Sequence, residues 1–206
     1  IPKDTLHLAL VLSKSATGKI KSLNIEKAMA INGVYKILTS EDIPGKNQIG
    51  PIIHNEPALA QNRVEYIGQP IAVVIAKDHN TAQKAAKLVN IEILDDEEPI
   101  FDLKIAMKRN SLVMPKMLLK KGDALKKINN SEYVIEDEIT IGGQDHFYLE
   151  GQISLVIPDE DNKFTVWSST QHPTEVQHCV ANVLGISQAK VTSKVRRLGG
   201  GFGGKE

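Results

Sequence analysis

Residues 190–206, KVTSKVRRLGGGFGGKE, contain the stretch that constrains the fold most strongly. A strand-like run over 190–197 leads directly into a tail in which five of the last eight residues are glycine. Glycine at this density costs backbone entropy, and it is used where φ is positive or where the backbone approaches a ligand closely. We therefore predict a strand that ends in a glycine-rich binding loop.

Two phosphate-binding motifs nearly fit this loop. Gly199, Gly201 and Gly204 satisfy G-x-G-x-x-G, but a dinucleotide site also needs a following helix and an acidic residue about 20 positions further on. Residues 199–205 fit G-x-x-x-x-G-K, yet a P-loop continues with Ser or Thr, and the carboxylate of Glu206 would repel phosphate. A tight turn that binds no ligand is the structural alternative.

The residues before the loop predict an α/β unit. A hairpin is expected from strands over 153–157 and 163–167, and a helix from Pro173 that ends at Gly185. The order strand, helix, strand and glycine turn brings loops together at one end of a sheet. Charges that alternate with apolar residues predict one more strand over 132–141.

The first half of the chain alternates predicted strands and helices. The run over 70–76 is uninterrupted and apolar, as in a strand buried on both faces. Asn24 and Asp78 are expected to cap the two helices. The other predicted elements are strands over 6–12, 34–38 and 91–94, and helices over 25–30 and from 79 onward. The fold class is therefore α/β, or α+β if the sheets are mixed.

Composition excludes several classes of function. Lys+Arg and Asp+Glu both number 25, so no global charge favours nucleic acid or an anionic membrane. No apolar run approaches the roughly 20 residues of a membrane span, and no secretory signal pattern is present, so we expect a cytoplasmic protein. Cys179 is the one cysteine, which excludes an internal disulfide and a four-cysteine iron–sulfur site in this chain. The six histidines show no zinc spacing, so any metal would come with a cofactor.

Two further segments favour one specific family. Residues 142–152 read GGQDHFYLEGQ, and residues 168–173 read SSTQHP. Together with the glycine tail they closely resemble the molybdopterin-binding (large) subunits of molybdenum hydroxylases, the xanthine dehydrogenase and aldehyde oxidase family, and best the separate bacterial subunit of xanthine dehydrogenase type. Segments 43–45, 50–54 and 66–74 are similar to the N-terminal region of that subunit, so the resemblance spans essentially the whole chain.

The resemblance implies a division into domains. It predicts an a/b hammerhead domain over 1–108, a linker over 109–122 and the beginning of a molybdopterin cofactor-binding domain over 123–206. The chain begins with Ile1 rather than methionine and ends without a terminating element, so both ends look cut from a longer polypeptide.

The resemblance also implies the roles of five residues. It places Gln144 beside the molybdenum oxo group, where a neutral amide can donate a hydrogen bond. It places Phe202 in the metal's immediate surroundings, with Gly200 and Gly201 allowing close backbone approach to the cofactor; none of these ligates molybdenum directly. Glu206 is expected to bond the purine substrate, at a position where aldehyde oxidases tend to carry an apolar residue.

The implied enzyme oxidises hypoxanthine and xanthine to urate in purine catabolism. Its general base, a glutamate, is expected beyond Glu206, so this chain would hold no catalytic residue and would be inactive alone. The remainder of the same subunit would complete the molybdenum–molybdopterin site, and a partner subunit would carry FAD and iron–sulfur clusters. Two alternatives stay open: oxidation of an aldehyde or another N-heterocycle, and a non-catalytic module that packs subunits together.

Overall fold

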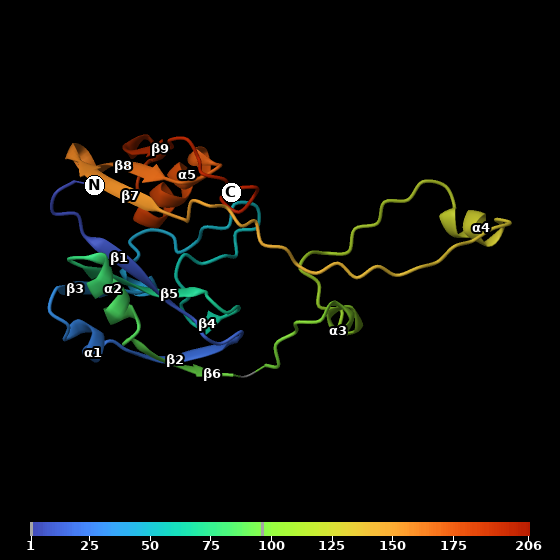
Figure 1. Ribbon diagram of the computed structural model, residues 1–206, viewed down its shortest axis with the longest axis horizontal. Coiled ribbons are helices and arrows are strands. Elements are labelled where there is room, and N and C mark those ends of the chain that lie inside the picture. Colours follow the sequence, from blue (N-terminus) through green and yellow to red (C-terminus); the bar gives the residue numbers. More distant parts are fainter. Residues whose placement is uncertain (1, 96) are drawn as a thin grey trace. The chain divides into compact units, whose positions relative to one another are not determined.

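The computed structural model describes residues 2–95 and 97–206. The chain divides into two units, one formed by the residues up to Pro99 together with His146–Glu206, and the other by Ile100–Asp145. Figure 1 shows the order of the elements along the chain. No helix in the described ranges has the length and apolarity needed to cross a bilayer.

A three-stranded antiparallel sheet forms the centre of the N-terminal half. Its order is β1 (His7–Leu12), β5 (Pro70–Ala76), β3 (Val34–Leu38), and both outer strands pair with β5. In β5, Ile71, Ala72, Val74 and Ala76 are buried. The uninterrupted apolar run thus forms the central strand, as predicted, because it can be covered on both sides.

A second antiparallel sheet has the order β4 (Arg63–Val64), β2 (Gly18–Asn24), β6 (Asn90–Leu94). Sequence reasoning predicted β6 but missed β2 and β4. A bulge between Ile20 and Ser22 interrupts the period-two alternation of β2, and β4 is only two residues long. Side chains of this sheet pack with Val64, Ile71 and Ala60 in one hydrophobic cluster.

Two helices cover the sheets: α1 (Glu26–Met29) and α2 (His79–Ala86). Asp78 caps α2 as predicted, because its Oδ1 accepts from the Thr81 N–H at 2.8 Å. Asn24 does not cap α1 directly; its Oδ1 accepts from the Glu26 N–H at 3.1 Å, while Ile25 is the N-cap residue. The main core cluster comprises Val11, Ala28, Ile37, Ala72, Val74, Ala85 and Val89.

The C-terminal residues form a mixed sheet with one helix. β7 (Ser154–Asp159) pairs antiparallel with β8 (Lys163–Ser168), and β8 pairs parallel with β9 (Val191–Lys194). Helix α5 (Pro173–Leu184) connects β8 to β9 and packs on the sheet (Figure 1). It begins at Pro173 and ends at Gly185, whose φ is 67°. Short 3₁₀ turns, η1 (Ser40–Asp42), η2 (Glu160–Asn162) and η3 (Gln188–Lys190), complete the elements of the first unit.

The predicted order of strand, helix, strand and glycine loop is therefore confirmed, and so is the mixed helix–strand class. The two N-terminal sheets are antiparallel, whereas the C-terminal sheet contains one parallel pair. The fold thus corresponds to the α+β form of the prediction.

The loop after η1 attaches the N-terminal half to α5. The N–H groups of Gly45 and Lys46 donate to the carbonyls of Val183 and Asn182 at 2.9 and 2.8 Å. These carbonyls belong to the last turn of α5, and that of Asn182 also accepts from the Gly185 N–H at 3.2 Å. A Cβ on Gly45 would overlap the Asn182 carbonyl oxygen and lie 2.8 Å from the Gly185 Cα. The backbone contact therefore requires glycine at position 45.

The second unit, 100–145, contains α3 (Leu103–Lys108) and α4 (Ala124–Asn129), capped by Asp102 and Asp123. Within this range, which the structure describes in full, no residue is buried. The predicted strand over 132–141 is wrong, because the segment pairs with no described strand. Its alternating side chains therefore belong to no sheet with a buried and an exposed face. The predicted domain and linker boundaries at 108 and 122 remain predictions.

We expect Gly45→Ala to destabilise the first unit by about 1–3 kcal/mol, because the added methyl group must push apart two backbones. The free energy of unfolding in urea measures this. Gly151→Ala is the matched control, since its Cβ would meet nothing within 4 Å. Equal stability of the two variants would contradict the proposed role of Gly45.

Candidate functional site

The glycine loop, residues 199–206, is held by two other segments of the first unit. Glu150 Oε2 accepts a hydrogen bond from the Gly199 N–H at 2.9 Å, and the Glu150 N–H donates to the Gly199 carbonyl at 3.2 Å. The Lys205 carbonyl accepts from the Gln171 N–H at 2.8 Å and from Thr170 Oγ1 at 3.0 Å. The loop thus lies against the end of motif segment 142–152 and against the middle of motif segment 168–173.

Lys205 is the buried anchor of the loop. Its side chain is 0% exposed, its Nζ donates to Ser169 Oγ at 2.7 Å, and it lies 3.4 Å from Glu150 Oε2. Ser169 Oγ in turn donates to Glu150 Oε2 at 2.8 Å. The ammonium also lies over the Tyr148 ring, 4.7 Å from its centroid. A buried ammonium needs such partners because desolvation is costly.

The same contacts favour the ionised form of Glu150. The Gly199 N–H lowers the pKa of this carboxyl most, followed by the Ser169 hydroxyl and then Lys205, while desolvation opposes them. Each of these groups donates to the carboxylate or carries the opposite charge. Glu150 is thus a charged residue at neutral pH that holds the loop in place.

Neighbouring side chains explain why this loop is rich in glycine. A Cβ on Gly199 would lie 2.5 Å from the Glu150 Cβ, and one on Gly204 would lie 2.6 Å from the Tyr148 ring. A Cβ on Gly201 would overlap the Gln171 amide. The motif segments therefore occupy the space that side chains of the loop would need.

The middle of the loop offers free backbone donors. Gly200 has φ of 99° and Phe202 has φ of 55°, which is unusual for a bulky residue. The N–H groups of Gly200, Gly201 and Phe202 donate no hydrogen bond to any residue that the structure describes, although Gly201 is buried. Consecutive N–H groups in such a turn form a concavity that suits an anionic or oxo group. These three residues thus fit the expected approach to a molybdenum–molybdopterin group.

Phe202 and Glu206 are exposed residues of the same loop. Phe202 is 73% exposed, so its ring does not anchor the loop in the core. Gln144 is also exposed and belongs to the second unit, 100–145. The predicted meeting of Gln144 and Phe202 at the metal therefore remains a prediction, as do the roles of all five predicted residues.

The structure argues against a phosphate-binding P-loop. A P-loop lysine reaches the phosphates, whereas Lys205 is buried on Glu150 and Ser169.

In the described ranges, no group of three or more His, Cys, Asp or Glu side chains could hold a metal ion. Burial and then Glu175 raise the pKa of the Cys179 thiol to about 11, so Cys179 is no thiolate nucleophile at neutral pH.

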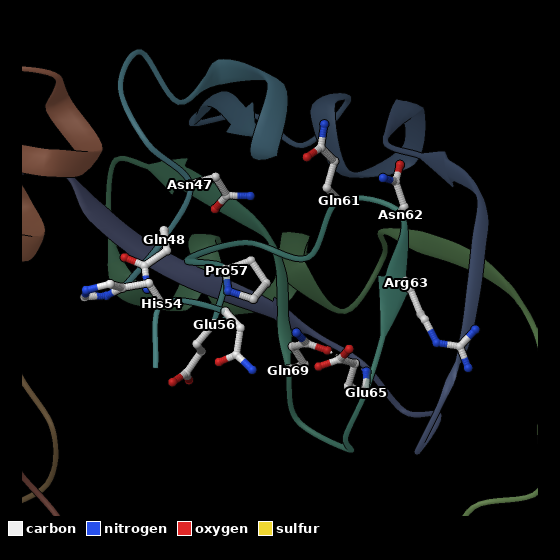
Figure 2. Close-up of a pocket in the computed structure, with 11 residues that line it drawn as sticks. Asn47, Gln48, His54, Glu56, Pro57, Gln61, Asn62, Arg63, Glu65 and Gln69 are labelled. Atoms are coloured by element: carbon white, nitrogen blue, oxygen red, sulfur yellow. Dashed lines mark hydrogen bonds between the residues drawn. The ribbon is translucent and has the colours of Figure 1, made fainter. Parts of the chain in front are cut away.

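A separate cavity of about 370 Å³ lies in the N-terminal half, lined by residues between Asn47 and Gln69 (Figure 2). Several of its polar side chains bind local backbone. Asn47 exchanges hydrogen bonds with both backbone groups of Leu59 at 2.7 and 3.0 Å, and the buried Gln69 accepts from the Glu65 N–H at 2.7 Å. These side chains stabilise an irregular segment, and none of the predicted site residues lies among them.

Sequence reasoning missed the residues that shape the loop, above all Lys205, Ser169 and Gln171. Ser169 and Gln171 belong to the SSTQHP motif over 168–173, but their spacing in the sequence does not indicate that they contact residues about 35 positions away. The sequence pattern pointed to Lys205 only as the last residue of a G-x-x-x-x-G-K phosphate motif. The available signal was a single lysine at the end of a glycine-rich run, where a charge in a closely packed loop needs a partner.

Lys205→Met removes the ammonium while keeping a long side chain. We expect amide hydrogen exchange over 199–206 to accelerate roughly tenfold or more, because Ser169 and Glu150 lose a charged partner. Lys163→Met is the control, since Lys163 is exposed and its nearest carboxylate oxygen lies 3.9 Å away. Unchanged exchange in the Lys205 variant would show that the ammonium does not hold the loop.

The lowered pKa of Glu150 predicts a pH dependence of loop order. Because the folded-state pKa lies below the ordinary value of 4.5, the contribution is fully present above about pH 4.5 and is lost as pH falls through the lowered pKa. Exchange over 199–206, corrected for its intrinsic pH dependence, should therefore accelerate in that acidic window. Glu150→Gln should remove this transition; if the transition persisted, another group would be responsible.

Curated relatives match nearly the whole chain. The xanthine dehydrogenase of Dictyostelium discoideum is 42% identical over 202 residues, which is 98% of this chain and 15% of the relative. The aldehyde oxidase 2 of Macaca fascicularis is 39% identical over 201 residues, 97% of this chain and again 15% of the relative. The chain thus spans about 15% of the length of these relatives.

Solved structures show the same fold. An aldehyde oxidoreductase from Desulfovibrio gigas matches with a TM-score of 0.85 and 24% identity, over 100% of this chain and 24% of that one. Quinoline 2-oxidoreductase from Pseudomonas putida 86 matches with a TM-score of 0.84 and 21% identity, over 100% of this chain and 28% of that one.

Two family models together account for almost all residues. Residues 1–97 match the a/b hammerhead domain of aldehyde oxidase and xanthine dehydrogenase. Residues 107–206, which include the glycine loop and both motif segments, match the molybdopterin cofactor-binding domain. With the relatives and the shared fold, these matches show that the chain belongs to the xanthine dehydrogenase and aldehyde oxidase family of molybdenum hydroxylases.

Proposed function

We propose that this chain is part of a molybdenum hydroxylase that oxidises hypoxanthine and xanthine to urate. The observation that carries the proposal is Glu206, an exposed carboxylate on a loop whose preceding residue is buried and fixed. A carboxylate can accept hydrogen bonds from the N–H groups of a purine, and a site built for them discriminates against ligands that lack them. The similar proteins include xanthine dehydrogenases, such as that of Dictyostelium discoideum.

The chain's own residues would bind and orient the reacting groups. The backbone N–H groups of Gly200, Gly201 and Phe202 would face the molybdenum–molybdopterin group, and Gln144 would donate its amide there. When bound, that group supplies the oxygen-transfer and two-electron chemistry of the reaction. The general base would lie elsewhere in the complete subunit, so these 206 residues alone are expected to be inactive.

Electron transfer after the reaction would depend on other parts of the enzyme. In this family, FAD and iron–sulfur clusters reside on other domains or chains. We propose a partner subunit for them here. Cys179 is the one cysteine of this sequence, which by itself cannot supply the thiolates of an iron–sulfur cluster.

A second candidate keeps the chemistry and changes the substrate to an aldehyde or another N-heterocycle. The aldehyde oxidase of Macaca fascicularis is nearly as similar to this chain as the xanthine dehydrogenase of Dictyostelium discoideum, at 39% against 42% identity. Glu206 favours the purine, because an aldehyde has no ring N–H for the carboxylate to bind. A module that only packs subunits together is the remaining alternative, and the absence of molybdenum from the purified complete enzyme would favour it.

Glu206→Val in the complete, cofactor-loaded enzyme tests the substrate. We expect kcat/KM for xanthine to fall roughly 10- to 100-fold, because a hydrogen bond to a charged group is lost at the substrate. Turnover of an aromatic aldehyde and the molybdenum content are the controls, and both should be retained. Unchanged xanthine kinetics would contradict the proposed purine contact.

A further inference from the structure

The side chain that touches Glu206 suggests how the loop selects its substrate. Gln171 Nε2 donates to Glu206 Oε1 at 3.2 Å. In the described residues, no other side chain forms a hydrogen bond or ion pair with that carboxylate. From this contact we infer that Gln171 is a positioning residue that sets the orientation and the hydrogen-bonding state of Glu206. The inference rests on the proposed purine function.

The structure determines which way the Gln171 amide faces. Its Oε1 accepts from the Gly203 N–H at 2.9 Å. A backbone N–H can only donate, so the carbonyl end of the amide must point toward Gly203 and the NH₂ end toward Glu206. The Gln171 main-chain N–H adds a third contact, to the Lys205 carbonyl at 2.8 Å. One residue therefore binds the loop at three positions.

Gly201 lacks a side chain where the Gln171 amide lies. A Cβ on Gly201 would overlap the Gln171 amide oxygen. Gly201 thus leaves room for Gln171 as well as offering a free backbone N–H. The amide is confined between Gly201 and Glu206, so its orientation is maintained without the mobility that an exposed glutamine normally has.

The contact has a chemical consequence for the ligand. An amide donor occupies one carboxylate oxygen of Glu206 without neutralising its charge. The other oxygen, Oε2, stays available to accept from a ligand N–H. A neutral donor at this position therefore supports recognition of a ring that offers N–H groups, and it gives no advantage to an aldehyde.

Gln171→Glu is the sharpest test, because it changes one end of the amide only. One oxygen of the introduced carboxylate can still accept from the Gly203 N–H, whereas the other replaces the donor and faces Glu206 Oε1. Two adjacent carboxylates repel one another, and the pair takes up one proton at a raised apparent pKa. Once protonated, the introduced carboxyl group can donate to Glu206 as the amide does.

The experiment uses the complete, cofactor-loaded enzyme at several pH values. The dissociation constant of urate, measured by calorimetry without turnover, should rise roughly 10- to 100-fold in Gln171→Glu at neutral pH and recover as pH falls. KM for xanthine should rise in parallel with the dissociation constant, while aldehyde kinetics change little. In a Glu206→Val background, Gln171→Glu should have no further effect on urate binding.

Gln152→Glu is the matched control for loosening of the loop. Gln152 Nε2 donates to the Gly204 carbonyl at 2.9 Å and, in the part of the chain that the structure describes, forms no hydrogen bond with Glu206. This variant should leave the ratio of purine to aldehyde kcat/KM unchanged. It separates a general effect on the loop from an effect on the carboxylate.

Three results would overturn the inference. If Glu206→Val weakens urate binding but Gln171→Glu does not, the purine function stands and Gln171 has no positioning role. If Gln171→Glu weakens purine and aldehyde use equally and without recovery at low pH, its role is only structural. If neither variant changes urate binding, the purine function and the inference both fail.

Discussion

The geometry of the candidate site depends on one buried ammonium group. Lys205 is fully covered, and its charge is balanced by Ser169, Glu150 and the face of the Tyr148 ring. Moving this group into the interior costs desolvation free energy, which only well-placed partners can offset. The partners come from two separate segments, so the lysine position fixes those segments relative to the loop. Phe202 and Glu206, which flank this anchor, are thereby held at the surface.

The glycines of the loop follow from the same constraint. Once Lys205 is drawn inward, the loop backbone lies so close to Glu150, Gln171 and Tyr148 that side chains at three loop positions would overlap them. Packing favours glycine at these positions, and the positive φ of 99° favours it at Gly200. Packing and ligand approach are compatible explanations, because the free backbone N–H groups belong to residues 200–202, and a glycine can both pack closely and offer its N–H.

The contact between the N-terminal half and α5 depends on backbone atoms. Gly45 and Lys46 donate to carbonyls in the last turn of the helix, and Gly185 allows the two segments of the chain to approach. Gly45 and Lys46 therefore bind the end of α5 although they lie far from it in sequence. The hammerhead domain thus supports the helix that follows the segment carrying Gln171.

Local sequence signals determined the elements with strong patterns and clear end signals. The apolar run of β5, the Asp78 cap of α2, and Pro173 with Gly185 around α5 were all predicted, because each depends on nearby residues alone. The family and the glycine loop were likewise recognisable from three motif segments. In contrast, β2 was missed because a bulge breaks its alternation, and the strand over 132–141 was wrong because a strand exists only where a partner strand pairs with it. The contacts of Lys205 and Gln171 could be decided only by tertiary structure, since desolvation and hydrogen-bond geometry depend on which distant residues fold against them.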